Sequence, residues 1–486
     1  MNKHVILPEA SIAAIERQFQ AMHAASRSEA PCSAAERKRL LRSLQQAVSA
    51  RSEDFAQAIS ADFGWRSHDE TRMAEVLPSL TMIQHAAARV ARWMRPERRG
   101  TAMHFWPARN RVYWQPKGVV LIIVPWNYPM QLAVGPLVAA LAAGNRVIVK
   151  PSEFVPATSA LLKQVLEGAL GPDRVSVALG GVEVAQALCR LPFDHILFTG
   201  STGVGRQVMK AAADNLTPVT LELGGKSPAI VDGDFDHGLA ALRIARGKLL
   251  NAGQTCIAPD YVLVRRDRVD DFARHYREKV AQLYPRIVDN RDYTAIVNTQ
   301  HLKRLTDLIA DARVNGSKVI VIDPAGELAD SEVAAADVRK MLPSLVIDPE
   351  PGAAVMTEEI FGPVLPVVPY DSIEDAVAFV NSRPRPLALY VFDNGRARTD
   401  MVLQRTVSGD ASVNDTIFHA AQENLPFGGI GASGMGAYHG HDGFRTFSHA
   451  KGVFFQSRWS LADLVAPPYG ARFKRIVKTA IRMNRR

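Results

Sequence analysis

Chemically reactive residues follow four apolar, strand-like segments of the sequence. The segments are residues 118–124, 146–150, 195–198 and 219–221, and the motifs PWNYP, PSE, TGS and ELGG come directly after them. Ligands of an open parallel sheet bind outside the carboxyl ends of its strands. If the four segments form such a sheet, the motifs are expected to line one crevice.

The glycines after the third segment could bind a pyrophosphate. Gly200, Gly203 and Gly205 let the backbone turn sharply from a strand into a helix, whose positive amino end attracts anions. Their spacing is GxxGxG instead of GxGxxG, so a glycine-rich turn without a ligand is the alternative. Lys150 and Glu153 lie where the ribose of an adenosine could bind, with a solvated turn at a strand end as the alternative.

Glu222 and Cys256 are candidate catalytic residues. Glu222 ends an apolar strand before two glycines, and burial of a carboxylate without a partner is costly. A structural ion pair is the competing interpretation. Cys256 lies among small polar residues in NAGQTCIAPD, but an isolated cysteine is more often an inert buried thiol than a nucleophile. Only the combination with the other motifs favours catalysis.

Composition and charge exclude several classes of protein. The chain has 486 residues, of which 47% are hydrophobic and 22% charged, as expected for two or three globular units. Seven of the nine net positive charges fall in residues 472–486, so the sequence predicts no nucleic-acid partner. Three widely spaced cysteines, no signal peptide and no long apolar run predict a cytoplasmic protein without disulfides or a metal site.

The chain divides into regions that differ in their pattern of apolar and polar residues. The first ninety or so residues are predicted to be helical, with a capping box at Ser33 and Glu36. An aromatic and basic stretch around residues 98–116 resembles a projecting hairpin. Residues 118–223 alternate strand-like and helix-like segments, which predicts a parallel, doubly wound sheet. A second α/β region follows over residues 225–425, and the glycine-rich LPFGGIGASGMGAYHG is predicted to be a loop.

Seven motifs occur in the order found in aldehyde dehydrogenases. They are PWNYP, KPSE, FTGSTGVG, LELGGKSP, GQTC, EEIFGPV and PFGGIGASGMG. The chain resembles that superfamily from about residue 30 to residue 455. The resemblance is closest to the shorter, class 3-like branch and, within it, to bacterial coniferyl aldehyde dehydrogenases.

The resemblance implies an α/β fold with a Rossmann-like NAD-binding domain, a second α/β catalytic domain and a small β oligomerisation element. The implied boundaries are 1–97 and 117–223 for the NAD-binding domain, 224–425 for the catalytic domain, 98–116 and 426–460 for the oligomerisation element, and 461–486 for a basic C-terminal tail.

The resemblance also assigns roles to individual residues. It makes Cys256 the nucleophile, Glu222 the general base and Asn127 the oxyanion donor. Unlike family members with adjacent cysteines, this chain flanks Cys256 with Thr255 and Ile257. The positions that match cofactor-binding residues of the family are Trp126, Lys150, Glu153, Gly200, Ser201, Gly203, Gly205, Leu223, Glu359 and Phe361.

The implied reaction is oxidation of an aldehyde to a carboxylic acid with NAD, and also NADP, as cofactor. Three alternatives are a broad-specificity or fatty aldehyde dehydrogenase, a relative that transfers the acyl group to coenzyme A, and a non-catalytic binding protein. Glu222 favours hydrolysis, because water needs a base more than a thiol does. Tyr128, Trp65 and Phe418 could stack on a flat aromatic aldehyde such as coniferyl aldehyde, with ordinary core packing as the alternative.

Two further segments suggest contacts between molecules. The hairpin near residues 98–116, together with GVFFQ, is expected to pair two subunits into a homodimer. Aromatic side chains exposed along a free strand edge would otherwise promote aggregation. The tail alternates apolar and basic residues at helical spacing. It is expected either to dock on the protein or to make a weak contact with an anionic membrane surface.

Overall fold

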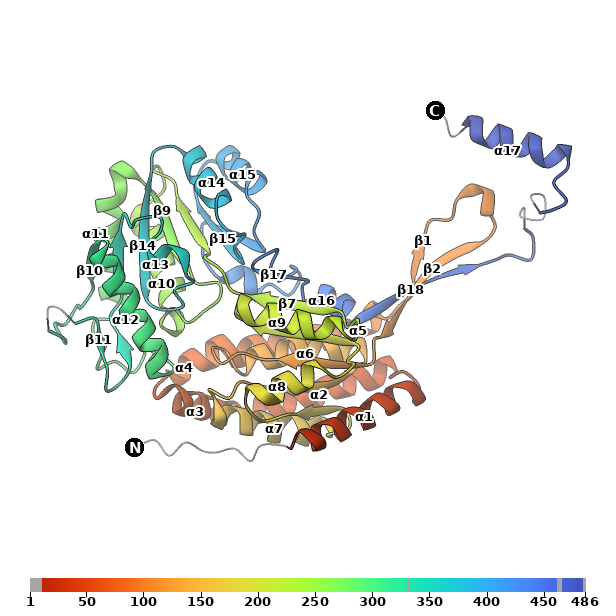
Figure 1. Ribbon diagram of the computed structural model, residues 1–486, viewed down its shortest axis with the longest axis horizontal. Coiled ribbons are helices and arrows are strands. Elements are labelled where there is room, and N and C mark those ends of the chain that lie inside the picture. Colours follow the sequence, from red (N-terminus) through yellow and green to blue (C-terminus); the bar gives the residue numbers. More distant parts are fainter. Residues whose placement is uncertain (1–10, 330–331, 461–465, 484–486) are drawn as a thin grey trace.

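The computed structural model describes residues 11–329, 332–460 and 466–483 of the chain. Two α/β units lie next to each other, and a long antiparallel ribbon projects from one of them (Figure 1).

A six-stranded sheet with the order β17-β7-β6-β3-β4-β5 forms the centre of the first unit. Its strands are β3 (Val119–Ile123), β4 (Arg146–Lys150), β5 (Val175–Val177), β6 (His195–Gly200), β7 (Val219–Leu223) and β17 (Gly434–Met435). Neighbouring strands are parallel, except that β17 runs antiparallel to β7. The parallel sheet predicted from the apolar segments is therefore confirmed.

Helices cover both faces of this sheet. Alternate residues of a strand point to opposite faces, so Val120 and Ile122 join one hydrophobic core while Leu121 joins another. The first core includes α2 (Ala34–Ala50), α3 (Ser52–Phe63), α5 (Leu77–Trp93), α6 (Gln131–Ala143) and α7 (Pro156–Leu170); the second includes α1 (Ile12–Ser28), α8 (Val182–Cys189) and α9 (Thr202–Ala213). This is the doubly wound arrangement.

The helical start of the chain follows from its capping and apolar spacing. The hydroxyl of Ser33 accepts a hydrogen bond from the N–H of Glu36 at 3.2 Å, and the leucines of α2 face the core. Between α3 and α5 the chain forms the short α4 (His68–Thr71) and a π-helical turn (Arg72–Val76). Such turns often mark functional positions.

The second unit contains a seven-stranded sheet in the order β10-β13-β14-β9-β8-β15-β16. Its strands are β8 (Pro228–Val231), β9 (Tyr261–Arg265), β10 (Lys318–Val321), β13 (Ser344–Ile347), β14 (Val364–Tyr370), β15 (Ala388–Phe392) and β16 (Asp410–Val413). The helices of this unit are α10 (His237–Leu249), α11 (Val269–Leu283), α12 (Thr299–Val314), α13 (Ala354–Thr357), α14 (Ile373–Asn381) and α15 (Arg396–Arg405), with a minor ladder of β11 (Ala334–Ala335) and β12 (Lys340–Met341). Only β10 pairs antiparallel, with β13.

The projecting ribbon consists of β1 (Glu97–Arg99), β2 (Arg109–Pro116) and β18 (Ser448–Phe455). The strand β18 pairs with β2 over its whole length. The segment that precedes β18 differs from the expected loop, because β17 extends the six-stranded sheet and α16 (Gly440–Thr446) packs its Phe444 into the first core. Residues 426–447 thus belong structurally to the body that carries the first sheet.

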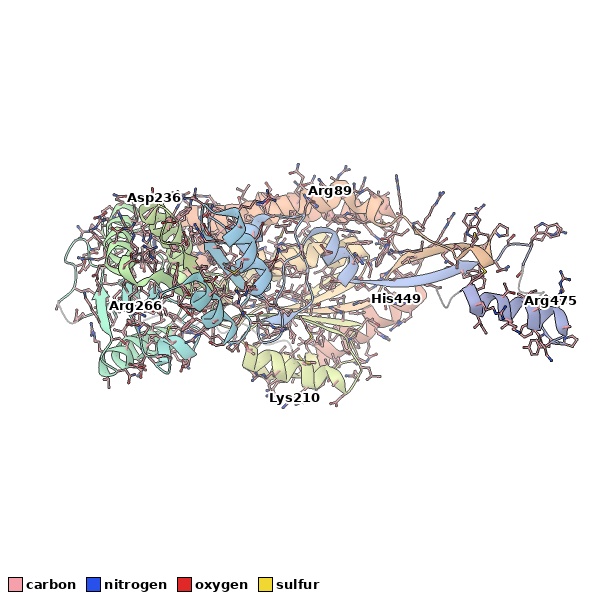
Figure 2. The ribbon with its side chains drawn as sticks, turned by 90° about the horizontal axis from the view of Figure 1, so that it is seen from above. Arg89, Lys210, Asp236, Arg266, His449 and Arg475 are labelled. Carbon is pink, nitrogen blue, oxygen red and sulfur yellow. The ribbon has the colours of Figure 1, made fainter. Side chains whose placement is uncertain are left out.

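The C-terminal helix α17 (Ala471–Met483) stands apart from the body (Figure 1). None of its described residues is buried. Figure 2 shows Arg475 on this helix at the end of the molecule, beyond His449 of β18.

Candidate active site

The loop that carries Cys256 leaves α10 through a kink. Asn251 and Ala252 adopt φ values of 53° and 50°, which turn the chain back on itself before Cys256. The side chain of Gln254 fastens this loop, because it donates to the carbonyl of Ala295 at 3.1 Å and accepts from the N–H of Val297 at 2.9 Å. Cys256 is therefore held on a fixed turn.

Two cavities meet at Cys256. One has a volume of about 200 Å³ and the other about 240 Å³, and Thr199, Glu222, Leu223 and Cys256 line both of them. The candidate nucleophile and the candidate base therefore lie at the junction of two spaces. One space can hold a substrate and the other a cofactor.

The 200 Å³ cavity is mainly apolar. The candidate substrate residues Tyr128 and Phe418 line it, together with residues that the sequence did not single out: Met73, Pro78, Leu132, Ile417, Phe427, Tyr438 and His439. Trp65 is not among its lining residues. The indole of Trp65 donates to the carbonyl of Arg291 at 2.8 Å and stacks on His68, so the prediction for Trp65 differs from the structure.

The 240 Å³ cavity gathers seven of the predicted cofactor and oxyanion residues. Trp126, Asn127, Gly200, Ser201, Leu223, Glu359 and Phe361 line it, and His301 and Arg304 join them. His301 and Arg304 come from α12, far along the chain and outside any recognised motif. No sequence signal pointed to them.

The remaining cofactor candidates lie outside the lining of this cavity. Lys150, at the end of β4, donates to Glu153 at 3.2 Å, and the Glu153 side chain is 38% exposed. A Cβ on Gly203 would meet no atom within 4 Å, which leaves room for a ligand at the start of α9. A Cβ on Gly205 would lie 2.6 Å from the Leu223 side chain, so Gly205 allows α9 to pack closely on β7.

The cavity fits a dinucleotide of the kind that the family resemblance implies. One buried carboxylate oxygen of half-buried Glu359 has no hydrogen-bond partner among the described residues. A Cβ on Gly224 would lie 2.1 Å from the other Glu359 oxygen, so a larger residue there would displace this carboxylate. At the start of α9, Ser201 caps the N–H of Val204, and helical geometry leaves other first-turn N–H groups for an anion.

Asn127 is oriented by the nucleophile loop. Its amide nitrogen donates to the carbonyl of Gln254 at 3.2 Å. An amide nitrogen carries two hydrogens, so the second can bind a developing negative oxygen next to Cys256.

Burial governs the ionisation of the two central side chains. Burial, and then the nearby Asp410, raises the pKa of Glu222 well above its usual range, and neither Glu222 oxygen has a partner among the described residues. Burial and the carboxylates of Glu359 and Glu222 raise the pKa of Cys256 to about 12. Burial therefore favours the protonated form of both groups.

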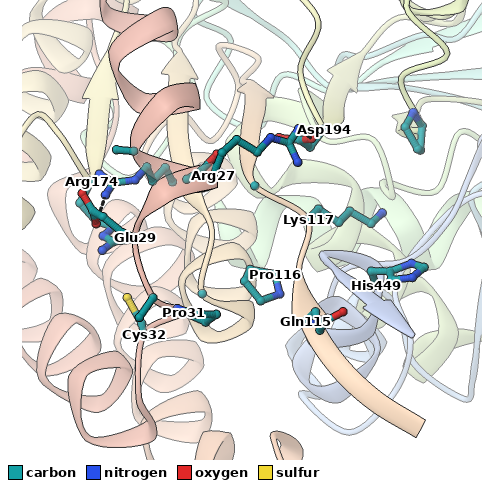
Figure 3. Close-up of a pocket in the computed structure, with 17 residues that line it drawn as sticks. Arg27, Glu29, Pro31, Cys32, Gln115, Pro116, Lys117, Arg174, Asp194 and His449 are labelled. Carbon is teal, nitrogen blue, oxygen red and sulfur yellow. Dashed lines mark hydrogen bonds and ion pairs between the residues drawn. The ribbon is translucent and has the colours of Figure 1, made fainter. Parts of the chain in front are cut away.

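A third cavity, of about 460 Å³, lies at the opposite, amino-end edge of the first sheet (Figure 3). Its charged lining is largely paired, since Arg27 binds Asp194 at 2.7 Å and Arg146 binds Glu29. Cys32 also lines it, but Glu222 and Cys256 do not. This cavity is separate from the candidate active site.

The comparisons with known proteins agree with this geometry. The model of the aldehyde dehydrogenase family matches residues 3–453, so the chain belongs to that family. Among curated relatives, a probable coniferyl aldehyde dehydrogenase of Pseudomonas aeruginosa is 50% identical over 463 residues, or 95% of each chain. Family 3 aldehyde dehydrogenases of mammals also match, which confirms the resemblance to the class 3-like branch.

Solved structures confirm the fold. A substrate-bound AldH of Staphylococcus aureus superposes with a TM-score of 0.89 at 37% identity, covering 96% of this chain and 99% of its own. A Mycobacterium tuberculosis aldehyde dehydrogenase complexed with NAD+ superposes with a TM-score of 0.83 at 28% identity, covering 94% and 92%.

Proposed function

We propose that the protein oxidises an aromatic aldehyde such as coniferyl aldehyde to its carboxylic acid, with NAD as the hydride acceptor. The observation that carries this proposal is the position of Cys256 and Glu222 at the junction of an apolar cavity and a second cavity fitted for a dinucleotide. The names of the relatives support the substrate class, and the NAD+ complex of a structural neighbour supports the cofactor.

The first half of the reaction uses Cys256 and Asn127. The thiolate of Cys256 adds to the aldehyde carbon, and the oxygen becomes a negatively charged alkoxide. The Asn127 amide stabilises this oxygen, a contribution of about 3 kcal/mol for one such donor. A nicotinamide bound in the 240 Å³ cavity would supply the hydride acceptor, and loss of hydride from the tetrahedral carbon would leave a thioester on Cys256.

The second half uses Glu222. Its carboxylate takes a proton from a water molecule that attacks the thioester, which releases the acid and restores the thiol. A raised pKa suits this role, because it makes the carboxylate a stronger base than that of an exposed glutamate. The carboxylate also argues against transfer to coenzyme A, whose thiol needs less help from a base.

We propose that the nicotinamide half of the cofactor and its phosphates are bound by the residues that line the 240 Å³ cavity. These residues are Trp126, Gly200, Ser201, Leu223, Glu359 and Phe361. Lys150 and Glu153 are proposed to bind the adenosine ribose, with Gly203 and Gly205 shaping the turn. Glu153 would favour NAD by repelling the extra phosphate of NADP. Its exposed side chain can swing aside, so NADP is proposed as a second, weaker cofactor.

The apolar lining of the 200 Å³ cavity supports an aromatic substrate, with Tyr128 and Phe418 on its wall. A fatty or broad-specificity enzyme is the alternative, because an apolar wall also accepts alkyl chains. The test compares kcat/KM for coniferyl aldehyde, benzaldehyde and long aliphatic aldehydes, by following the absorbance of NADH. Coniferyl aldehyde should be preferred; a preference for aliphatic chains would contradict the substrate proposal, and inactivity with every aldehyde would favour a non-catalytic protein.

We also propose that the ribbon pairs two chains into a homodimer. The ribbon exposes large apolar side chains, among them Trp106, Phe454 and Phe455, at its tip and along β18. Sedimentation at micromolar concentration tests this directly. A stable monomer would contradict it.

The tail and the cellular location complete the proposal. Helix α17 exposes Ile476 and Ile481 beside Arg472, Lys474, Arg475 and Lys478. We propose that this helix makes a weak contact with an anionic membrane surface, to which each basic residue adds about 1 kcal/mol.

Of the helices in the described ranges, none combines the length and hydropathy needed to cross a bilayer. The cytoplasm is the proposed location.

A further inference from the structure

We propose that Arg66 and Glu75 are positioning residues that hold the oxyanion donor Asn127 in place against Cys256. This inference rests on the function proposed for Cys256 and Asn127. It concerns two charged residues of the helical start of the chain to which no motif draws attention.

Arg66 is completely buried and touches the backbone of the oxyanion donor. One of its terminal nitrogens donates to the carboxylate of Glu75 at 2.7 Å and to the carbonyl of Asn127 at 3.1 Å. Its Nε donates to Glu70 at 3.2 Å. Burying such an ion pair contributes little net stability, because desolvation offsets the attraction. Its orientation of the Asn127 carbonyl therefore points to a functional role.

Glu75 fixes the other end of the same segment. It lies on the π-helical turn, and its second oxygen accepts hydrogen bonds from the N–H groups of Met130 at 2.8 Å and Gln131 at 3.1 Å. These groups belong to the first turn of α6, where a carboxylate also meets the positive end of the helix. The Arg66 and Glu75 pair thus spans residues 127–131 and fixes both ends.

The nucleophile loop contacts Asn127 from the opposite side. The amide of Asn251 donates to the Asn127 carbonyl at 3.1 Å, and the Asn127 amide donates to the Gln254 carbonyl at 3.2 Å. Arg66 and Asn251 therefore hold one carbonyl oxygen between them. The side chain of Asn127 is left with a single direction in which its second N–H can point.

Arg66 also acts on the wall of the substrate cavity. Its guanidinium lies over the ring of Tyr128, 4.8 Å from the centroid. The Tyr128 hydroxyl is 2.7 Å from the hydroxyl of Thr255, the residue before Cys256. One planar cation thus contacts both Asn127 and Tyr128, which line the two cavities that meet at Cys256.

The test compares Arg66→Lys with Arg37→Lys. Arg37 is equally buried and donates to the carbonyl of Ala142 at 2.8 Å, near the opposite end of the same helix α6, but touches no candidate site residue. Lysine keeps the charge and loses the fork that binds two partners. The rate of the first NADH burst should fall about 10²-fold in Arg66→Lys, as expected for misplacement by about 1 Å, and stay unchanged in Arg37→Lys.

A double-mutant cycle separates positioning from general damage. In an Asn127→Ala background the amide is absent, so the loss that Arg66→Lys causes through Asn127 disappears, and Arg66→Lys should slow the burst much less than in the wild-type background. Additive effects, or equal burst rates in wild type and Arg66→Lys, would overturn the inference. If Arg66→Lys does not fold, Glu75→Gln takes its place in the same cycle and should give the same non-additivity. A wild-type protein that forms no NADH with any aldehyde would instead contradict the proposed function, and the role of Arg66 with it.

Discussion

Glu222 and Gly434 face each other across the antiparallel pair of β7 and β17. Next to them, the N–H of Leu223 donates to the carbonyl of Ser433 at 3.0 Å, so the glycine-rich segment forms the wall behind the candidate base. Gly434 has a φ of 138°, and a Cβ there would lie 2.0 Å from the carbonyl oxygen of Leu221. Only glycine can bring the two strands together at this point.

Replacing Gly434 should therefore damage both stability and catalysis. Gly434→Ala combines a left-handed backbone with a clash against backbone atoms, and the strain alone costs about 1–3 kcal/mol. We expect a lower Tm and a slower hydrolytic step. The matched control is Gly168→Ala in α7, where a Cβ meets no atom within 4 Å and alanine favours the helix, so Tm should stay or rise. Equal Tm values for the two variants would contradict this account.

The charge of Glu222 should control the reactivity of Cys256. Glu222 helps to raise the pKa of the thiol, and its own pKa is raised, so its effect grows as alkaline conditions ionise it. Removing that negative charge lowers the thiol pKa and increases the thiolate fraction. Glu222→Gln should thus be alkylated by iodoacetamide faster than wild type at alkaline pH, with a smaller difference at neutral pH.

Peptide mass spectrometry measures this alkylation at Cys256 separately from Cys32 and Cys189, which are both buried. One unit of pKa corresponds to a tenfold change in thiolate at a given pH below both values. Equal alkylation rates for Glu222→Gln and wild type at alkaline pH would show that the carboxylate does not face Cys256.

Glu153 should set the choice between NAD and NADP. Glu153→Gln removes the charge that opposes an extra phosphate, and since the side chain is partly exposed the effect is modest. The ratio of kcat/KM for NAD to that for NADP should fall about threefold to tenfold. Glu278→Gln on the exposed face of α11 removes the same charge in the second unit and should leave the ratio unchanged. An unchanged ratio in Glu153→Gln would rule out the ribose contact.

Deleting residues 472–486 tests the tail. If α17 contacts an anionic membrane surface, the full chain should float with anionic vesicles at low salt and detach at high salt. The deletion should lose this binding and keep its kinetics in solution. Absence of vesicle binding by the full chain, or a deletion that lowers Tm or changes the substrate range, would show that the helix docks on protein instead.

The central sheet could be predicted because its strands are buried on both faces and appear as continuous apolar runs, as in β3 and β4. Glu222 and Asn127 could be proposed because each follows such a run, whereas Cys256 was proposed from the family resemblance of its motif GQTC. Parallel strands that end at one edge bring Asn127 and Glu222 together, but Cys256 comes from the loop after α10, and only the fold brings that loop to the same point.

Other features had no local signal. The strand β17 is two residues long and lies within a glycine-rich motif, so its pairing with β7 depends on a tertiary contact. Arg66 lies in a stretch that looks like an ordinary polar surface, WRSHDE, and only the fold shows that it is buried. Trp65 precedes Arg66 and was predicted to line the substrate cavity. The two neighbouring side chains point in different directions, because Arg66 contacts Asn127 whereas Trp65 contacts Arg291.

The most direct test of the account is the first turnover of Glu222→Gln with coniferyl aldehyde and NAD. Hydride transfer comes before the step that needs the base, so we predict a burst of NADH equal to the active sites, followed by a stall. Intact-protein mass spectrometry should then show an acyl group, and peptide mapping should place it on Cys256. Cys256→Ala should give neither burst nor adduct while still binding NAD. Sustained turnover in either variant, or an adduct on another residue, would contradict the assignment of Cys256 and Glu222.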